Sequence, residues 1–295
     1  MPSYALIEKF IGYIDILGYS ALTKAAEAGN GFSFAEMSDL LKMLGSESDR
    51  KRYVEDGPSL CPMAPRVRND IDFQIAQVWD SVVISTEVSP AGVANIISHC
   101  FGACIQLLTK GVMCRGYVKR GMIYHDGQTI FGSGHVDAVA REKQVSVFKQ
   151  SADERGTPFI EVDPDVVAYV AEQPDKCVKE MFGRMTVAHD GQTAVFPIKR
   201  LSHSFLIGGF GTKFDPEKEK KSNDVMRNSL KGLKTRIMAF ADPADESVMR
   251  KVNHYIRALD EQLKVCDRTD NFIDRLMQPI GRRMTPEDFP GMFRK

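Results

Sequence analysis

Two short runs of sequence decide the fold: Phe10–Ser20, which reads FIGYIDILGYS, and Gln77–Ile84, which reads QVWDSVVI. Each run is rich in β-branched and aromatic residues, which is typical of a buried strand. Each run also carries one carboxylate, Asp15 or Asp80, among apolar side chains. Because an ionised carboxylate buried without a partner costs several kcal/mol, such groups are paired or bind a metal ion.

The alternation of side chains along a strand places each carboxylate on an apolar face, Asp15 beside Tyr13 and Asp80 beside Val78. If the two strands are neighbours, the two carboxylates can meet. A pair of hard oxygen donors, completed by water and phosphate, is typical of a Mg²⁺ or Mn²⁺ site. The alternative is that each aspartate pairs with an arginine or lysine at a strand end, and residue types alone favour neither interpretation.

The sequence around these runs predicts an α+β chain. We expect strands over 4–17 and 73–86, with a helix over 20–44 and a polar, proline-rich loop or flap over 45–72 between them. The elements expected after these are a helix over 90–108 with Ser89 as its N-cap, a hairpin turn at 125–127, a helix over 136–148, a strand over 159–162, a helix over 164–171, and weaker strands over 193–199 and 204–208.

The C-terminal part of the chain has a different composition, with charges of both signs and a helical pattern. We expect residues 1–212 to form a ferredoxin-like α+β sandwich, an antiparallel-rich sheet with helices on one face, and residues 213–295 to form a helical extension. The apolar residues that share one helical face of this extension, and that we assign to a core or dimer contact, are Val248, Val252, Tyr255, Leu259, Leu263 and Cys266.

Composition limits the classes of protein to which the chain can belong. Its 295 residues include 39 Lys plus Arg and 39 Asp plus Glu, so a protein that wraps nucleic acid through excess positive charge is disfavoured. Six cysteines without a Cys-x-x-Cys pair predict reduced thiols and a cytoplasmic protein. The uncharged stretch 88–109 approaches the length of a membrane span, but its polar residues and helical stripe predict a core helix, so we expect no membrane association.

Four motifs occur in the order found in class III nucleotide cyclases. Phe10–Ser20 resembles the first metal motif, F-x-D-I-x-G-F, and Val78–Ile84 resembles the second. Cys114–Gly121, CRGYVKRG, resembles the R-x-G-I-x-x-G strand, and Gly132–Glu142, GSGHVDAVARE, resembles G-x-x-V-N-x-A-x-R-x-E. The four motifs are distributed over about residues 5–145, half of the chain, and their sequences are most similar to those of the bacterial Pycsar pyrimidine cyclases.

The resemblance implies roles for particular residues. Asp15 and Asp80 would bind two divalent cations per active site, Mn²⁺ or Mg²⁺, with the Ile16 carbonyl as a further ligand. Arg141 matches the arginine that stabilises the pentavalent phosphate. Asp137 stands where the family usually has the asparagine that orients the ribose, which is a departure from the pattern. The resemblance also implies a homodimer in which the metal residues of one subunit face Asp137 and Arg141 of the other.

The positions implied to read the base depart further from the purine-specific pattern. Ala76 stands where purine-specific members have a lysine, and Gly134 stands near their second purine-reading residue. Trp79, next to Asp80, is a candidate substrate contact, although packing is favoured over base stacking as the role of its ring. A pocket without both purine-reading groups favours a pyrimidine nucleotide.

The resemblance therefore implies an enzyme that converts UTP to 3′,5′-cyclic UMP and pyrophosphate, a second messenger for anti-phage defence that acts on a separate cyclic-nucleotide-responsive effector. Three alternatives stay open: a cyclase that makes cyclic CMP from CTP, a catalytically silent homologue that binds nucleotide, and another two-metal enzyme such as a cyclic-dinucleotide synthase. The silent homologue is motivated by Asp137, whereas the last lacks any G-G-D-E-F-like run here.

Overall fold

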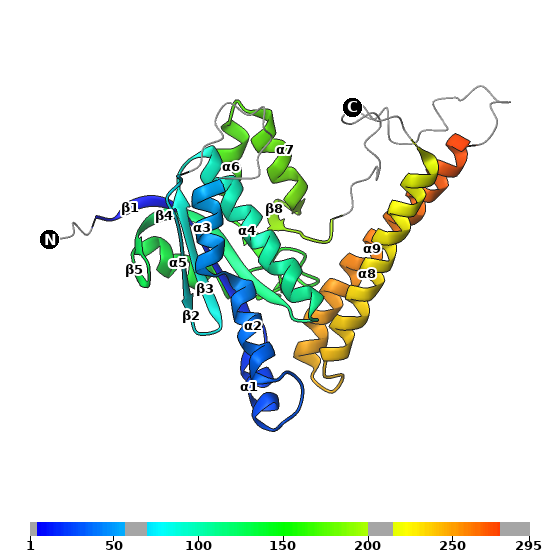
Figure 1. Ribbon diagram of the computed structural model, residues 1–295, viewed down its shortest axis with the longest axis horizontal. Coiled ribbons are helices and arrows are strands. Elements are labelled where there is room, and N and C mark those ends of the chain that lie inside the picture. The colour runs from blue at the N-terminus through cyan, green and yellow to red at the C-terminus, as the bar shows by residue number, and fades with distance from the viewer. Residues whose placement is uncertain (1–4, 57–69, 200–214, 278–295) are drawn as a thin grey trace.

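A computed structural model of the chain describes residues 5–56, 70–199 and 215–277. Its centre is a sheet of order β2-β3-β1-β4-β6-β8-β7, in which β5 pairs with β4 (Figure 1). The pairing of β4 with β6 is parallel and the other described pairings are antiparallel. The strands are β1 (Ile7–Ile16), β2 (Phe73–Val78), β3 (Ser81–Glu87), β4 (Cys114–Asp126), β5 (Thr129–Phe131), β6 (Ile160–Val162), β7 (Thr186–His189) and β8 (Gln192–Val195).

The helices pack around this sheet, and the α+β class predicted from the sequence is confirmed. Most of them contribute to one continuous core, whereas α5 packs against the opposite face of β1 and β4. The helices are α1 (Tyr19–Glu27), α2 (Phe34–Leu44), α3 (Glu47–Asp56), α4 (Pro90–Thr109), α5 (Ser133–Glu142), α6 (Pro164–Glu172), α7 (Lys176–Met185), α8 (Pro216–Phe240) and α9 (Glu246–Met277).

Alternation along β1 divides its side chains between the two faces. Phe10 and Ile14 point into the larger core, and Gly12 lets Ile96 and Cys100 of α4 approach the strand on the same side. Ile11 points to the other face, where it packs with residues of β3, β4 and α5 in a small cluster. The odd-numbered residues of β1, Asp15 among them, therefore share the face that α5 partly covers.

The prediction of one strand over 73–86 is wrong. Trp79 and Asp80 form a two-residue turn, and β2 and β3 pair with each other on either side of it. The run contains no glycine, proline or asparagine, and Asp80 and Ser81, which are turn-forming residues, stand inside an apolar stretch that is typical of one continuous strand. The turn is instead stabilised by sheet pairing, because β3 also pairs with β1.

Two other expectations are corrected in the first 56 residues. The helix expected over 20–44 is interrupted at Gly29 and Gly31, which both have positive φ, and α2 restarts with a capping box between Ser33 and Glu36. The flap expected over 45–72 contains a helix, α3, over its first part. Residues 57–69 of that flap lie outside the described residues, as does the strand expected over 204–208.

The expected helical extension is present as α8 and α9, which form an antiparallel pair that runs beyond the sheet (Figure 1). Tyr255 of α9 is fully buried, with its ring centroid 5.0 Å from that of Phe159. His254 lies 2.8 Å from the Glu154 carboxylate, also in a buried position. The stripe predicted on this helix is therefore a core contact, while the boundary at 212/213 stays a prediction.

The uncharged stretch forms α4, with Ser89 as its N-cap and Pro90 at its start as predicted. This helix is long and apolar enough to cross a membrane, but 72% of its most apolar window is buried inside the fold. It is the only helix with that property in the described ranges. Its composition is thus explained by its place in the core.

Candidate active site at the end of β1

The structure brings the two predicted carboxylates together. Asp15 is in register with Ser81, the first residue of β3, and the amide of Ile16 donates to the carbonyl of Asp80 over 3.1 Å. Burial, followed by the negative charge of Asp80, raises the pKa of Asp15 to about 7. The turn between β2 and β3 therefore places a second acidic group where it opposes ionisation of the first.

An arginine lies nearby but is engaged elsewhere. Arg115 of β4 is directly opposite Asp15, and its guanidinium binds the buried carboxylate of Glu142 and the carbonyl of Gly156. Among the described residues neither Asp15 nor Asp80 forms an ion pair. Within the described ranges the alternative, in which each aspartate pairs with a basic residue, is therefore not observed, although Arg115 and Lys143 lower the pKa of Asp15.

The donor set fits a divalent cation that keeps water and phosphate as ligands. In the part of the chain that the structure describes, no three His, Cys, Asp or Glu side chains converge on one point. Mg²⁺ is usually bound by one or two carboxylates together with waters and substrate phosphates, which matches Asp15 and Asp80. The raised pKa of Asp15 fits this assignment, because a cation would relieve the repulsion between the carboxylates. The ligand role of the Ile16 carbonyl stays a prediction.

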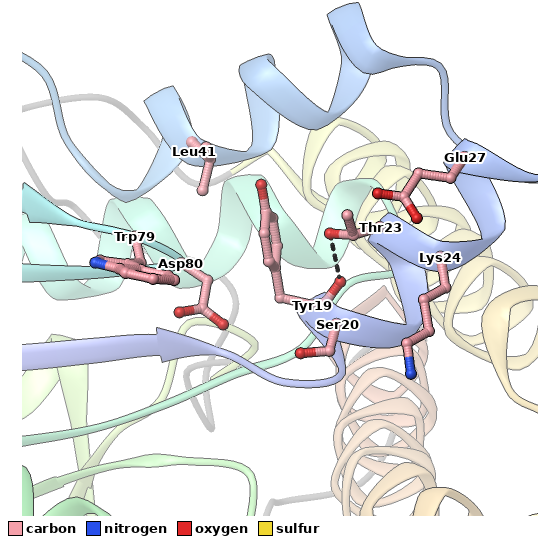
Figure 2. Close-up of a pocket in the computed structure, with 8 residues that line it drawn as sticks. All are labelled: Tyr19, Ser20, Thr23, Lys24, Glu27, Leu41, Trp79 and Asp80. Carbon is pink, nitrogen blue, oxygen red and sulfur yellow. Dashed lines mark hydrogen bonds between the residues drawn. The ribbon is translucent and has the colours of Figure 1, made fainter.

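A pocket of about 540 Å³ opens beside Asp80 (Figure 2). Its wall follows one side of α1, which begins directly after Leu17 and Gly18 at the end of β1. Gly18 has positive φ and no side chain to cap the helix, so the first turn of α1 is open to an external acceptor. The lining residues are Tyr19, Ser20, Thr23, Lys24, Glu27, Leu41, Trp79 and Asp80.

Asp137 and Arg141 lie on α5, away from this pocket. Both are exposed and four residues apart, so they share one side of the helix. The Asp137 carboxylate accepts from Lys119 of β4 over 2.8 Å. Neither residue lines the pocket beside Asp80 within one protomer.

The two positions implied to read the base are also outside the pocket. Ala76 is completely buried in β2. A Cβ atom on Gly134 would lie 2.5 Å from the terminal Cδ1 of Ile11 and 3.0 Å from backbone atoms of Gly121 and Met122, so close packing of α5 on the sheet favours glycine there. By contrast Trp79 lines the pocket and is 89% exposed, so the expectation that its ring packs in the core is wrong.

Sequence reasoning did not single out four residues of this region. Tyr19 and Lys24 line the pocket, and Arg115 and Glu142 form the buried pair beside Asp15. Tyr19 lies within the first motif. The amphipathic pattern of residues 19–27 would have identified the side of the helix on which Tyr19 lies. The Arg115–Glu142 pair could not be found in this way, because it depends on the register between β1 and β4.

Comparison with known proteins gives little further assignment. No protein-family model matches the sequence, and no curated protein matches it. The solved structure of a bacterial light-regulated adenylyl cyclase is similar to this chain, with 13% identity and a TM-score of 0.33. The match covers 65% of this chain and 52% of that one, so the chain spans about half the length of that protein. At this identity and TM-score the comparison assigns neither an activity nor a substrate.

Proposed function

We propose that the chain is a metal-dependent nucleotidyl cyclase. One observation carries the proposal: Asp15 and Asp80, far apart in sequence, lie close together where β1 ends beside the β2–β3 turn, without ion-pair partners among the described residues, and Asp80 lines the adjoining pocket. The two aspartates belong to the first two of four motifs that resemble class III nucleotide cyclases in order. Position and sequence resemblance thus support the same chemistry.

In the proposed reaction the ribose 3′-oxygen attacks the α-phosphorus in line. A bond forms from O3′ to phosphorus, the bond to the bridging oxygen of the β-phosphate breaks, and pyrophosphate leaves with that electron pair. The hydroxyl proton passes to solvent. Divalent cations bound by Asp15 and Asp80 would lower the pKa of the 3′-hydroxyl and neutralise phosphate charge. The open first turn of α1 would supply backbone N–H donors for the phosphates, and Lys24 further along the helix is a candidate cationic contact, although Glu27 lines the same wall.

A homodimer is part of the proposal, because Asp137 and Arg141 are exposed and outside the pocket of their own protomer. In a symmetric pair each α5 would present Arg141 to the partner's pocket, where its charge stabilises the pentavalent phosphate. Mixing two inactive variants, Asp80→Asn and Arg141→Ala, tests this arrangement. Random exchange of subunits would restore about a quarter of wild-type turnover, since half of the dimers would carry one intact site of two. No recovery after exchange would contradict a shared site.

The proposed substrate is a pyrimidine nucleoside triphosphate, with UTP ahead of CTP. Support comes from the resemblance of the motifs to Pycsar cyclases and from Ala76, where purine-specific members have lysine. The product, cyclic UMP, would act as a second messenger on a separate effector in anti-phage defence. Gly134 supports this choice less than its sequence position indicates, because packing also favours glycine there.

The deciding experiment incubates the purified protein with UTP, CTP, ATP or GTP and Mn²⁺ or Mg²⁺, and separates the products by chromatography. We expect cyclic UMP and pyrophosphate from the wild type, and a loss of at least about a thousandfold in Asp15→Asn and Asp80→Asn. Asp190→Asn, in the exposed turn between β7 and β8, is the matched control and keeps full turnover. Nucleotide binding without pyrophosphate release would replace the cyclase with a nucleotide-binding homologue. Full turnover in both site variants would overturn the metal assignment.

A further inference from the structure

Trp79 is placed where a tryptophan is unfavourable for the isolated fold. It occupies the first position of the two-residue turn between β2 and β3 with φ of 60°, a conformation that favours glycine in such hairpins. A bulky residue held at positive φ is strained. The side chain is also 89% exposed, so it gains almost nothing from burial.

The fold offers no compensation for this placement. Among the described residues no aromatic ring stacks on the indole, and the Gln77 side chain bonds only to the Trp79 carbonyl, over 3.3 Å. Glycine would satisfy the turn without strain, and a polar residue would suit the exposure. The indole is therefore best explained by a contact that the isolated chain does not make.

The surroundings of Trp79 indicate the chemistry of that contact. Figure 2 shows the rings of Trp79 and Tyr19 on either side of Asp80, at the edge of one pocket. Leu41 adds an apolar wall, while Ser20 and Lys24 make the other end of the pocket polar. Lys24 shares this end with the carboxylate of Glu27, so the pocket combines two aromatic rings at one end with polar groups of both signs at the other, which suits a molecule with a flat ring and a polar tail.

We propose that Trp79 and Tyr19 form an aromatic clamp for the nucleobase of the triphosphate. The inference rests on the proposed function and extends it, because it identifies which side chains contact the base. Stacking uses the face of the ring, which every base has, so the clamp supplies affinity and tolerates both uracil and cytosine. Selection between these bases then falls on groups other than Trp79.

Fluorescence tests the clamp directly, because Trp79 is the only tryptophan of the chain. The probe is 3′-deoxyuridine triphosphate with Mg²⁺, which lacks the attacking hydroxyl and cannot be cyclised. We expect saturable quenching with this probe and with the cytidine analogue, and no quenching with tripolyphosphate. Equal quenching by tripolyphosphate would overturn the clamp. A blue shift that depends on protein concentration without nucleotide would also overturn it, since Trp79 would then lie between two copies of the chain.

Steady-state kinetics supplies the second test and separates stacking from a structural role. Trp79→Gly removes the ring and relieves the turn, so it should fold at least as well as the wild type while KM for UTP rises about 5- to 100-fold and kcat changes little. Trp79→Phe should recover most of this loss, and Tyr19→Leu should raise KM in the same sense. The control is Phe34→Ala, which removes another exposed aromatic ring at the start of α2.

Failure of the clamp and failure of the cyclase give different results. If the wild type forms cyclic product but Trp79→Gly has an unchanged KM, the clamp is wrong and the cyclase stands. If the wild type forms no product from any triphosphate, the proposed function fails first. Quenching by the 3′-deoxy analogues would then still identify Trp79 as a nucleotide contact.

Discussion

The two faces of the central sheet differ in what closes them, although β1 contributes to both. On the face that α4 covers, Phe10 and Ile14 are fully buried in a core that reaches from α2 to α9. On the other face the fully buried apolar cluster has only four members, and Tyr13 and Asp15 are partly open. One strand thus supplies an apolar surface to one side and a polar one to the other.

The polar face contains paired charges where the apolar face contains packed rings. Arg115 binds Glu142 across β4 and α5, and Lys119 binds Asp137 further along the same elements. Interactions of this kind stabilise a fold less than apolar burial does, but they fix the positions of charged groups. The comparison indicates that stability comes mainly from the α4 face, while the α5 face carries Asp15, Asp137 and the paired charges.

The largest expected effect is loss of a ring from the α4 face. Phe10→Ala removes a fully buried side chain whose ring lies 5.1 Å from that of Tyr169, and we expect a loss of about 3–5 kcal/mol in the free energy of unfolding. Urea denaturation measures it. Phe34→Ala, which is 67% exposed in the native protein, should change this free energy by less than about 0.5 kcal/mol. Equal midpoints for the two variants would contradict the contrast between the faces.

A smaller loss is expected when the buried ion pair of the α5 face is broken. Glu142→Gln leaves the Arg115 guanidinium partly buried without its carboxylate, and should lower the free energy of unfolding by about 2–4 kcal/mol. Adding Arg115→Met should recover part of this loss, because the isolated charge is removed. A double-mutant cycle measures the coupling, and a value near zero would show that the pair is not structural.

The sequence was sufficient for elements whose signals are local. The Ser89 cap that starts α4, the hairpin turn at 125–127 between β4 and β5, and the helix expected over 164–171 were all predicted and are all present. The break between α1 and α2 was missed although Gly29 and Gly31 were there to indicate it. The turn at Trp79 was missed because Asp80 was interpreted as a buried carboxylate within one strand, whereas it belongs to a turn stabilised by sheet pairing.

The residues of the candidate site likewise divide into those that the local sequence identifies and those that depend on tertiary packing. Asp15 and Asp80 were found because a carboxylate in an apolar run is visible in the sequence alone. Their companion Glu142 was not found, since only the register of β4 against β1 and the packing of α5 bring it near Asp15. Gly134 was interpreted as a lost base contact, which stays a prediction, and its close approach to the backbone of Gly121 is a second reason for glycine that only tertiary packing reveals.

A third effect on the free energy of unfolding concerns Asp15. Substitution of this residue should stabilise the protein, whereas the two substitutions above should destabilise it. Its pKa in the folded protein is raised above the unfolded value, so this carboxyl contributes stability at low pH that is lost as the pH rises through about 7. In metal-free protein, Asp15→Asn should therefore be more stable than the wild type at pH 8, by about 1–2 kcal/mol after allowing for solvent screening. The difference should shrink towards pH 5, as measured by thermal unfolding in EDTA.

Added Mg²⁺ or Mn²⁺ sharpens this prediction. Cation binding to the folded state should raise Tm of the wild type at pH 8 and leave that of Asp15→Asn nearly unchanged. Asp190→Asn is again the control, because its carboxylate is exposed and remote from the site. A wild type that is more stable than Asp15→Asn at pH 8 in EDTA would mean that Asp15 is satisfied without a metal ion.

The smallest effect on stability is expected at the exposed end of the α5 face. Lys119 and Asp137 form an ion pair in which the aspartate is well exposed, so Lys119→Met and Asp137→Ala should each change the free energy of unfolding by less than about 1 kcal/mol. If α5 faces a partner's pocket, turnover should fall in Asp137→Ala by far more than this stability change can explain. Comparing chemical denaturation with kcat for these two variants separates the roles. Loss of stability with unchanged turnover would instead make this end of the face structural, like the side that α4 covers.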